Sequence, residues 1–466
     1  MHSQPMDWVP DLSDRPGPKY LSIARAMAED IATGALQPGT QLPTHRELAY
    51  QLGVTVGTVS RAYAEATRRG LIDGEVGRGT FVRRRIGRDM GEIPAGANRG
   101  GIDFGLNFPP MGDMERDAFS DALKEIADSR DLMTLMAYAP HGGAPRHRQA
   151  AADWMRALGV ETDAGRSIVT TGGQNGMLAA FAALVQAGDT ILVEKLTYPG
   201  IVPLAEMLGL KVQPVDMDAE GVRPDSLEEA CRSFAPRALY CMPTLQNPTN
   251  AVMGERRRED IAAIAERYNL ILVEDDLYRF LVADAPPPLA NYLPDQTIFI
   301  TSAAKQLAPG LRIGGVSAPR AMVPKLERAM RASTWMAAPA MAEVFALWVD
   351  RGIAGVLARE KAEEMRVRQA AASEILQGFE FAGHPTSMHL WLTLPEPWTD
   401  RDAVAVLGEH GVIASSGQVF ATSPGAGRNR LRLSLGNPKD LKIVRHGLGV
   451  IAETLAGAPQ QAASIV

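Results

Sequence analysis

Apolar residues near the start of the chain recur at the spacing of amphipathic helices. Between residues 20 and 32, those on or near one face are Leu21, Ile23, Ala24, Met27 and Ile31. Thr44 can cap a second helix that stops at Gly53, and Thr55 can cap a third helix that Gly70 closes. Two short runs around a glycine-rich turn then predict a β-hairpin. Residues 1–83 are therefore predicted to form three helices and a hairpin.

A different pattern begins at about Ile102, where short β-branched runs alternate with helical stretches. The candidate strands are 191–194, 211–215, 238–242, 270–274, 297–301 and 312–317, with helices between them at 174–186, 199–208, 225–234 and 255–268. This alternation predicts an α/β domain with a mostly parallel sheet and helices on both faces. Beyond Pro319 the chain is helix-rich, and it then offers strands near 388–393, 411–420 and 430–435 and a last helix near 438–454. That end of the chain is typical of a smaller α+β domain.

These patterns predict the domain boundaries. They are an N-terminal unit at 1–83, a linker at 84–101, a large domain at 102–320, interdomain helices with a small C-terminal domain at 321–455, and a tail at 456–466. The linker shows little apolar periodicity and contains several Gly and Arg residues. No internal repeat is visible along the chain.

The charge distribution separates the first unit from the rest of the chain. Residues 1–88 hold 12 Lys or Arg and 9 Asp or Glu, whereas the remaining residues hold 36 and 45. A basic unit on an acidic body favours a nucleic-acid partner for that unit alone, with a solvated basic surface as the alternative. Hydrophobic residues make up 46% and charged residues 22%, which excludes a disordered or fibrous chain.

Membrane, secretion and metal signals are weak. No apolar run approaches the roughly 20 residues of a membrane helix, and the first residues form no apolar signal core. Cys231 and Cys241 make no C-x-x-C pattern, and the histidines show no metal-ligand spacing. We therefore expect a cytoplasmic protein with no metal site.

Fixed spacings in the first unit carry a resemblance to a known family. The segments are Leu42-Pro43-Thr44-His45-Arg46-Glu47-Leu48-Ala49, then Leu52-Gly53-Val54-Thr55-Val56-Gly57-Thr58-Val59, then Gly77-Arg78-Gly79-Thr80-Phe81-Val82. Over about residues 18–83 they resemble the winged helix-turn-helix of the GntR family of bacterial transcription factors. The resemblance implies contacts with a double-stranded DNA operator by Arg46, Thr55, Thr58 and the wing residue Arg78, and Arg61 is a further candidate. A surface salt bridge with Glu47 or Glu65 is the alternative for Arg46.

Lys305 is the first candidate for chemistry in the α/β body. It follows the apolar strand 298–301, precedes the Pro309-Gly310 turn, and has the small neighbours Ala303 and Ala304. A lysine at a strand end among small residues can lose basicity by desolvation and act as a Schiff-base amine. An exposed lysine is the alternative that this segment alone leaves open.

Further polar residues lie at predicted strand ends or at a helix start, where open α/β sheets bind ligands. In chain order they are Gly173 and Gln174, Tyr198, Asn247, Asp275 and Tyr278, Ser302, Lys305 and Arg312. A buried carboxylate such as Asp275 needs a cationic partner, and a protonated pyridine nitrogen would supply one. Ser302 and Arg312 suit a phosphate, and Tyr198 could stack on an aromatic ring.

This order and spacing resemble the pyridoxal 5'-phosphate site of fold-type I aminotransferases over roughly residues 102–455. The resemblance implies that Lys305 holds the cofactor as a Schiff base, that Asp275 keeps its ring nitrogen protonated, and that Asn247 and Tyr278 bond its ring oxygen. It also implies that Tyr138 reaches the phosphate of the partner subunit and that Arg432 holds a substrate or effector carboxylate, with Arg430 as the competitor. After Thr249 the aminotransferases usually have Gly, where this chain has Asn250.

A GntR-like head on a fold-type I aminotransferase-like body resembles the MocR subfamily. The resemblance implies a transcriptional regulator that uses pyridoxal phosphate to sense an amine or amino-acid effector, as a homodimer with a head-to-tail arrangement. Two alternatives stay open: a working aminotransferase with a fused DNA-binding head, and a regulator whose signal is the cofactor itself.

Overall fold

The computed structural model describes residues 8–12, 18–33, 36, 40–68, 71–75, 79–82 and 101–458. The chain divides into two compact units, residues 1–88 and residues 89–466. Most of the predicted linker and of the predicted tail lies outside the described residues. Among the described residues, no helix is long and apolar enough to cross a membrane.

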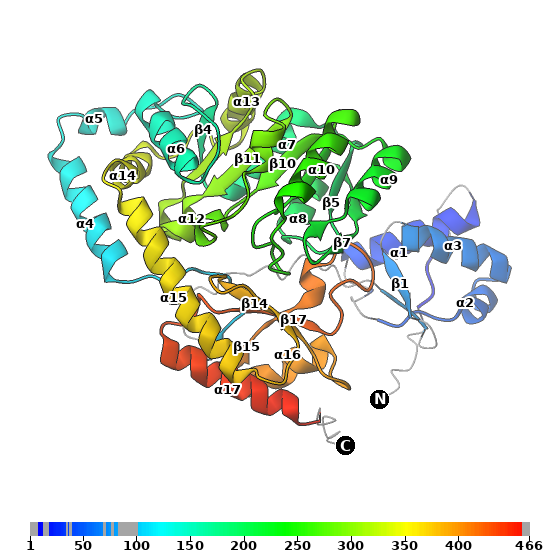
Figure 1. Ribbon diagram of the computed structural model, residues 1–466. Coiled ribbons are helices and arrows are strands. Elements are labelled where there is room, and N and C mark those ends of the chain that lie inside the picture. Colours follow the sequence, from blue (N-terminus) through cyan, green and yellow to red (C-terminus); the bar gives the residue numbers. More distant parts are fainter. Residues whose placement is uncertain are drawn as a thin grey trace. The chain divides into compact units, whose positions relative to one another are not determined.

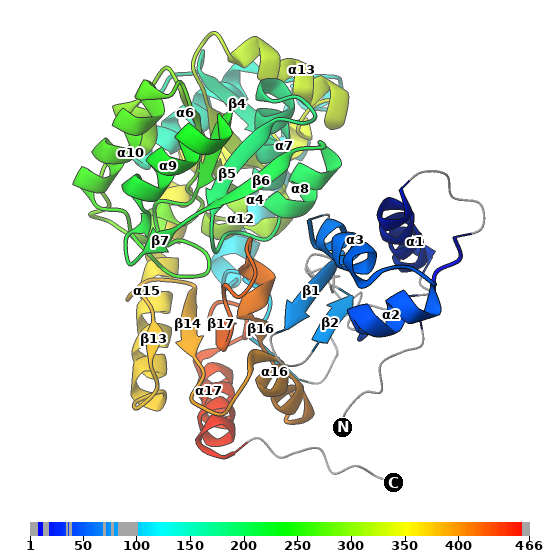
Figure 2. The same cartoon turned by 90° about the vertical axis from the view of Figure 1, so that its right-hand side faces the viewer.

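The described residues of the first unit form three helices and a two-stranded hairpin, whose arrangement Figures 1 and 2 show. Its elements are α1 (Lys19–Thr33), α2 (His45–Gln51), α3 (Val56–Arg68), β1 (Ile72–Glu75) and β2 (Gly79–Val82). Thr44 begins α2 through a capping box with Glu47, which satisfies backbone donors at the helix start. The turn between α2 and α3 passes through Gly53, whose φ of +61° suits a residue without a side chain. Ile23, Leu48, Val59 and Tyr63 form the core, together with residues of the hairpin.

The second unit is built on a seven-stranded mixed sheet. Its order is β4 (Ser167–Thr170), β12 (Gly314–Ser317), β11 (Thr297–Ser302), β10 (Ile271–Asp275), β9 (Ala238–Cys241), β5 (Thr190–Glu194) and β6 (Lys211–Val215). The strands from β11 to β6 are parallel, and β12 runs antiparallel to both β11 and β4. The predicted mostly parallel sheet is confirmed. The edge strand β4 was not among the sequence-predicted strands.

Alternating side chains of the strands bury the two faces of this sheet under different helices (Figure 1). Ile298 and Ile300 pack with α7 (Gly173–Leu184), α8 (Ile201–Met207) and α13 (Val323–Ser333). Phe299, between them, packs with α6 (Pro145–Ala157) and α14 (Pro339–Asp350). On the same side, Leu239 and Leu272 pack with α9 (Pro224–Phe234) and α10 (Glu255–Arg267). This alternation follows from the two-residue period of a strand.

The C-terminal part of the second unit is a smaller α+β layer. Its sheet has the order β13 (Phe381–Ala382), β14 (His389–Thr393), β17 (Arg430–Ser434) and β16 (Ser415–Ser416). The long helix α15 (Ile353–Ile375) and the helices α16 (Asp400–Glu409) and α17 (Leu441–Ala456) contribute to its core (Figure 2). β3 (Ile102–Asp103) pairs with β15 (Val412–Ile413), so the start of this unit is joined to its end.

One predicted strand, 411–420, is wrong as a continuous element. The structure has β15, β16 and a 3₁₀ helix at Gly417–Phe420 there. The chain turns because the Ser416 hydroxyl accepts from the backbone N–H of Gln418 and because Gly417 approaches another backbone segment closely. A Cβ on Gly417 would come within 2.3 Å of the Gly427 carbonyl oxygen.

The remaining described elements are short connections, apart from one longer helix. They are α4 (Asp113–Asp128), α5 (Leu132–Leu135), β7 (Met217–Asp218), β8 (Gly221–Val222), α11 (Leu289–Tyr292), α12 (Ala303–Gln306) and 3₁₀ helices at Arg279–Leu281 and Pro309–Leu311.

Candidate functional site

Lys305 lies on α12, directly after the carboxyl end of β11. Its ammonium group is buried and donates to the backbone carbonyl of Asn107. Burial, and secondarily the positive charge of Arg432, lowers the pKa of the Lys305 amine to about 8, although Asp275 opposes the shift. A lysine with this pKa is partly neutral near physiological pH, and the neutral amine is the form that attacks a carbonyl carbon.

Asp275 ends β10 beside Lys305. One carboxylate oxygen, Oδ2, accepts a 2.5 Å hydrogen bond from the hydroxyl of Tyr240 on β9, and the other, Oδ1, is buried without a protein partner. Burial raises the pKa of the Asp275 carboxyl to about 7, against the opposing effects of Tyr240 and Lys305. Sequence reasoning missed Tyr240, because an aromatic residue inside a buried strand is indistinguishable from a core residue.

Tyr278 follows Asp275 at the same sheet edge and contacts two residues that sequence reasoning did not select. Asn107 Nδ2 donates to the Tyr278 hydroxyl oxygen at 2.8 Å, and the rings of Tyr278 and His389 meet edge to face at 5.8 Å. Asn107 belongs to the segment between β3 and α4, and His389 begins β14. No sequence signal marks Asn107, and the sequence shows of His389 only that it lacks metal-ligand spacing.

A second group of residues gathers at the start of α7, which follows β4. Gly172 has a φ of +83°, and a Cβ there would come within 2.8 Å of a guanidinium nitrogen of Arg312. Arg312 also donates to the carbonyl of Thr171 at 3.4 Å. A glycine turn with free backbone donors beside an arginine suits a phosphate. Gly173 begins the helix, and the amide of its neighbour Gln174 donates to the Gly200 carbonyl at 3.3 Å.

Ser302 and Tyr198 flank this group. The Ser302 hydroxyl accepts from the backbone N–H of Ala304 at 3.2 Å and lies 3.4 Å from the Ile313 carbonyl. Tyr198 is largely buried, and its pKa is raised to about 12 by burial and by Asp275, while Arg312 opposes the rise. Tyr198 therefore lies within electrostatic reach of both the Asp275 end and the Arg312 end of the site.

Asn247 lies in the loop after β9, which Gln246 anchors. The Gln246 amide donates to the Leu196 carbonyl at 2.6 Å and to Glu194 at 3.1 Å, and the amide oxygen of Asn247 is buried without a protein partner. Asn250, where the aminotransferases usually have Gly, adopts a φ of +64°, a conformation that asparagine tolerates better than most residues. Its amide donates to the His389 carbonyl at 3.1 Å, so Asn250 fastens this loop to the C-terminal layer.

Arg432 on β17 reaches the same site from the C-terminal layer. Its guanidinium donates to the Gly105 carbonyl, lies 3.3 Å from the Ser415 hydroxyl and stacks over Phe420, whereas its Nε is buried without a partner. Burial lowers the pKa of Arg432 to about 10. The competitor Arg430 instead donates to the Thr393 hydroxyl.

The residues present fit pyridoxal phosphate. Four buried polar atoms in the described part of this site have no protein partner: Thr171 Oγ1, Asn247 Oδ1, Asp275 Oδ1 and Arg432 Nε. Burying a polar atom without a hydrogen-bond partner destabilises the folded state, unless a ligand or a water molecule supplies that partner. An unpartnered carboxylate oxygen suits a protonated ring nitrogen, and the Gly172–Arg312 cradle suits a phosphate. In the same described residues, no group of His, Cys, Asp and Glu could hold a metal ion.

Tyr138 is not part of this cluster. Its side chain is 83% exposed and lies 5.7 Å from the ring of Trp335, which is itself exposed. Nearby exposed methionines include Met133 and Met136 on and beside α5.

Of the candidate DNA-contact residues, Arg46 lies on α2, Thr58 and Arg61 lie on α3, and Thr55 directly precedes α3. Arg46 and Thr55 are exposed, and Thr55 and Thr58 bond each other through their hydroxyls at 2.9 Å at the start of α3. The Arg61 guanidinium lies 5.7 Å from the ring centre of Tyr20 on α1, which is a cation–π arrangement within the unit. Arg78 falls outside the described residues.

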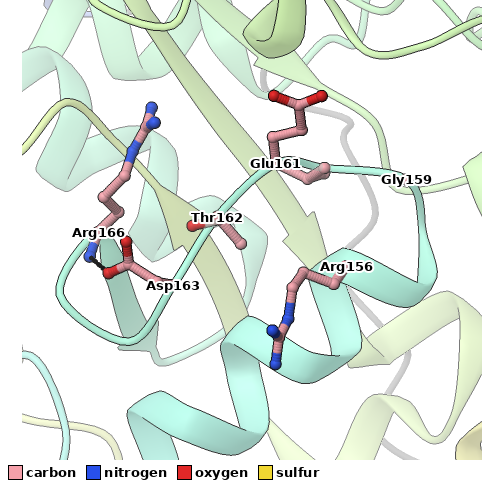
Figure 3. Close-up of a pocket in the computed structure, with 7 residues that line it drawn as sticks. Arg156, Gly159, Glu161, Thr162, Asp163 and Arg166 are labelled. Carbon is pink, nitrogen blue, oxygen red and sulfur yellow. Dashed lines mark hydrogen bonds between the residues drawn. The ribbon is translucent and has the colours of Figure 1, made fainter.

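A separate hollow of about 490 Å³ is lined by Arg156, Gly159, Val160, Glu161, Thr162, Asp163 and Arg166. Figure 3 is a close-up of its lining. The hollow lies before the amino end of β4. β4 runs in the same direction as β11, so the amino end of β4 is on the side of the sheet opposite to the carboxyl end of β11. The hollow is therefore at the other end of the strands from Lys305. It therefore does not belong to the candidate cofactor site.

The fold and the site define a fold-type I, pyridoxal-phosphate-dependent class of protein with an N-terminal helix-turn-helix unit. Residues 99–448 match the model of the aminotransferase class I and II family, and residues 19–82 match that of the gntR family of bacterial regulatory proteins. The chain belongs to the aminotransferase class I and II family and has the MocR-like architecture, in which a GntR domain precedes the aminotransferase-like domain. Its cofactor is pyridoxal 5'-phosphate.

Similar proteins are regulators and aminotransferases. The uncharacterized HTH-type transcriptional regulator YdeF of Bacillus subtilis is 30% identical over 97% of both chains. An aromatic amino acid aminotransferase of Schizosaccharomyces pombe is 33% identical over 44% of this chain and 47% of its own. The crystal structure of Pyrococcus horikoshii kynurenine aminotransferase shares the fold, with a TM-score of 0.71 and 23% identity over 77% of this chain and 91% of that chain.

Proposed function

We propose that this protein is a DNA-binding transcriptional regulator that senses an amine or amino acid through the site around Lys305. The observation that carries this proposal is the presence, in one chain, of a GntR domain and of a buried lysine beside unpartnered polar atoms that suit pyridoxal phosphate. Relatives matched over nearly the whole chain are named as transcriptional regulators, which supports the same interpretation.

In this proposal each residue of the site has one task. Lys305 holds the cofactor covalently, Asp275 pairs with its ring nitrogen, and Asn247 and Tyr278 bond its ring oxygen. The remaining contacts, with the phosphate and the ring face, come from Gly173, Gln174, Ser302, Arg312 and Tyr198. Bound pyridoxal phosphate supplies an aldehyde carbon that reacts with primary amines.

Arg432 is proposed to bind an effector carboxylate. Its buried Nε has no partner, and its guanidinium lies close enough to Lys305 and Tyr278 to influence the pKa of each. An amino acid offers an amine and a carboxylate together, so it can engage the Lys305 end and Arg432 at once. Lys305 and Arg432 belong to different layers of the unit, and a ligand that contacts both can favour one arrangement of the two layers.

A homodimer completes this proposal. Exposed apolar side chains at Met133, Met136, Tyr138 and Trp335 support an interface on this part of the second unit. Tyr138 would then reach the phosphate of the partner subunit's site, in the head-to-tail arrangement that the MocR resemblance implies.

An active aminotransferase is the second candidate. It is favoured by one observation: the chemistry-bearing set of Lys305, Asp275 and Tyr278 is complete and buried at one sheet edge. A turnover measurement distinguishes the regulator from the aminotransferase, because an enzyme converts many equivalents of amino acid per subunit. A third candidate, in which cofactor occupancy alone is the signal, predicts a change in DNA binding on adding pyridoxal phosphate without any amine.

The test is operator binding by the purified holo-protein, measured at one salt concentration against a panel of amines and amino acids. The upstream region of the gene itself serves as the DNA. We expect at least one carboxylated amine to change the affinity and Arg432→Ala to lose most of that response while keeping basal affinity. Arg430→Ala is the matched control and should respond like wild type. An effector acting equally on wild type and Arg432→Ala would remove Arg432 from the proposal.

A further inference from the structure

A chain of hydrogen bonds connects the loop after β9 with the hydroxyl of Tyr278. His389 Nε2 lies 3.4 Å from the Gln246 carbonyl oxygen, and His389 Nδ1 lies 3.4 Å from Asn107 Nδ2. Asn107 Nδ2 also donates to the Tyr278 hydroxyl oxygen at 2.8 Å, and the Ser434 hydroxyl donates to Asn107 Oδ1 at 3.0 Å. His389, Tyr278 and Ser434 are each at most 3% exposed, and Asn107 between them is half-buried.

The Gln246 end of this chain fixes the direction of every bond in it. A backbone carbonyl oxygen can only accept, so His389 must carry its proton on Nε2. Burial, together with the nearby positive charges of Arg432 and Lys305, lowers the pKa of His389 to about 3, so the ring is neutral. A neutral imidazole has one N–H, and Nδ1 is therefore an acceptor.

An acceptor at Nδ1 also orients the amide of Asn107. Its NH₂ group must face His389 and Tyr278, and its carbonyl oxygen must face Ser434, whose hydroxyl can adapt to either role. The Tyr278 oxygen then accepts from Asn107, so the hydroxyl hydrogen of Tyr278 has to point elsewhere. Among the described residues, Asn107 is the hydrogen-bond partner of the Tyr278 hydroxyl, and none accepts that hydrogen.

We infer that His389 and Asn107 are positioning residues that hold Tyr278 as a hydrogen-bond donor toward the cofactor's phenolic oxygen. This inference rests on the proposed contact between Tyr278 and the cofactor, and it adds the groups that give that contact its direction. If His389 did not accept from Asn107 through Nδ1, the Asn107 amide could turn over and present its oxygen to Tyr278. The hydroxyl would then donate to Asn107 instead of the cofactor.

His389 offers a matched pair of variants. His389→Phe removes both ring nitrogens and keeps an aromatic side chain in the buried strand. His389→Gln keeps one donor and one acceptor on an uncharged side chain. The backbone contacts of residue 389 with Asn250 and Gln369 use its carbonyl oxygen and remain available in both variants. Gln246 keeps a partner too, because its carbonyl also accepts from the Asn250 backbone N–H at 2.7 Å.

The first readout is the pH midpoint of the bound cofactor's visible absorption band. A donated hydrogen bond stabilises the anionic phenolic oxygen, so loss of the donor raises the midpoint. We expect His389→Phe to raise it by about one pH unit, which corresponds to about 1.4 kcal/mol, and His389→Gln to stay within a few tenths of wild type. Tyr278→Phe should raise the midpoint as well, and adding His389→Phe to it should raise it no further.

The second readout is measured on the wild-type apo-protein, and a variant serves only to assign the His389 signal. Long-range ¹H–¹⁵N spectra of histidine-labelled protein should show His389 as the Nε2–H tautomer, without titration between about pH 5 and 8. Either variant identifies the signal among the 8 histidines of the chain. An Nδ1–H tautomer, or a charged ring in that range, would overturn the inference.

The outcomes distinguish the positioning role of His389 and Asn107 from the proposed contact between Tyr278 and the cofactor. If Tyr278→Phe raises the midpoint and His389→Phe does not, the contact of Tyr278 with the cofactor stands and the positioning role fails. If Tyr278→Phe leaves the midpoint unchanged, both fail. Additive shifts in the double variant would also overturn the positioning role, because they would show that His389 acts on the cofactor by another route.

Discussion

Removing the Tyr240 hydroxyl should make cofactor binding strongly pH-dependent. Tyr240 donates to Asp275 Oδ2 at 2.5 Å in a fully buried setting, and this bond favours the ionised carboxylate. A hydrogen bond to a charged group contributes about 1.5–3 kcal/mol, which equals about one to two pKa units. In Tyr240→Phe the pKa of Asp275, about 7 in the intact apo-protein, therefore rises by about that amount.

The consequence for affinity follows from the ionised fraction of Asp275. At pH 7 the fraction is about one half when the pKa is about 7, and it falls to between about one tenth and one hundredth in the variant. If only the carboxylate pairs with a protonated ring nitrogen, the apparent dissociation constant of pyridoxal phosphate should increase roughly 5- to 50-fold at pH 7. The size of the loss depends on pH: it should grow below pH 7 and shrink toward about pH 9, where the carboxyl ionises again.

The assay is an absorbance titration of apo-protein with pyridoxal phosphate at several pH values between about 6 and 9. Tyr292→Phe is the matched control, because it removes a tyrosine hydroxyl beside a carboxylate, Glu255, away from Asp275. The control should bind like wild type throughout. An affinity of Tyr240→Phe that matches wild type across the range would refute the reasoning, and so would a loss that persists unchanged at the alkaline end.

Two further predictions address the lysine and the DNA-binding unit. Lys305→Ala should lose cofactor that borohydride fixes to the chain, as read by mass spectrometry, whereas the surface variant Lys325→Ala should retain it; reducible cofactor on another lysine would contradict this role for Lys305. Arg46→Ala should weaken operator binding about 10- to 100-fold, the value of a good arginine–base contact, without changing the cofactor spectrum. The exposed Arg25 on α1 offers a control variant, and equal gel-shift affinities for Arg46→Ala and wild type would exclude the contact.

Local sequence rules were sufficient for most of the elements and for the edge of the sheet that carries the candidate site. Apolar strands followed by polar residues predicted β9, β10 and β11, and parallel pairing brings their carboxyl ends together. The capping residues Thr44 and Thr55 predicted the starts of α2 and α3 because capping depends on neighbours only a few positions away. The wrong strand at 411–420 reflects a contact with Gly427, which no local pattern reveals.

The residues that sequence reasoning missed act through long-range contacts. Asn107 and His389 are 282 positions apart, and Asn107 and Tyr278 are 171 apart. Asn107 lies in a short connection, and its place depends on the Asp103 side chain, which accepts from the backbone N–H groups of Gly105 and Leu106. A polar side chain in such a segment resembles any loop asparagine until the tertiary fold shows what it contacts.

The position of that segment explains how one ligand could influence two layers of the second unit. Residues 102–107 connect β3, which pairs with β15 of the C-terminal layer, to the site around Lys305. Within it, Gly105 accepts from Arg432 and Asn107 accepts from Lys305. A ligand that draws Lys305 or Arg432 away therefore removes a hydrogen bond from a segment already tied to the C-terminal layer. Because a ligand shifts a conformational equilibrium only through contacts that differ between the states, this segment is where such a difference can arise.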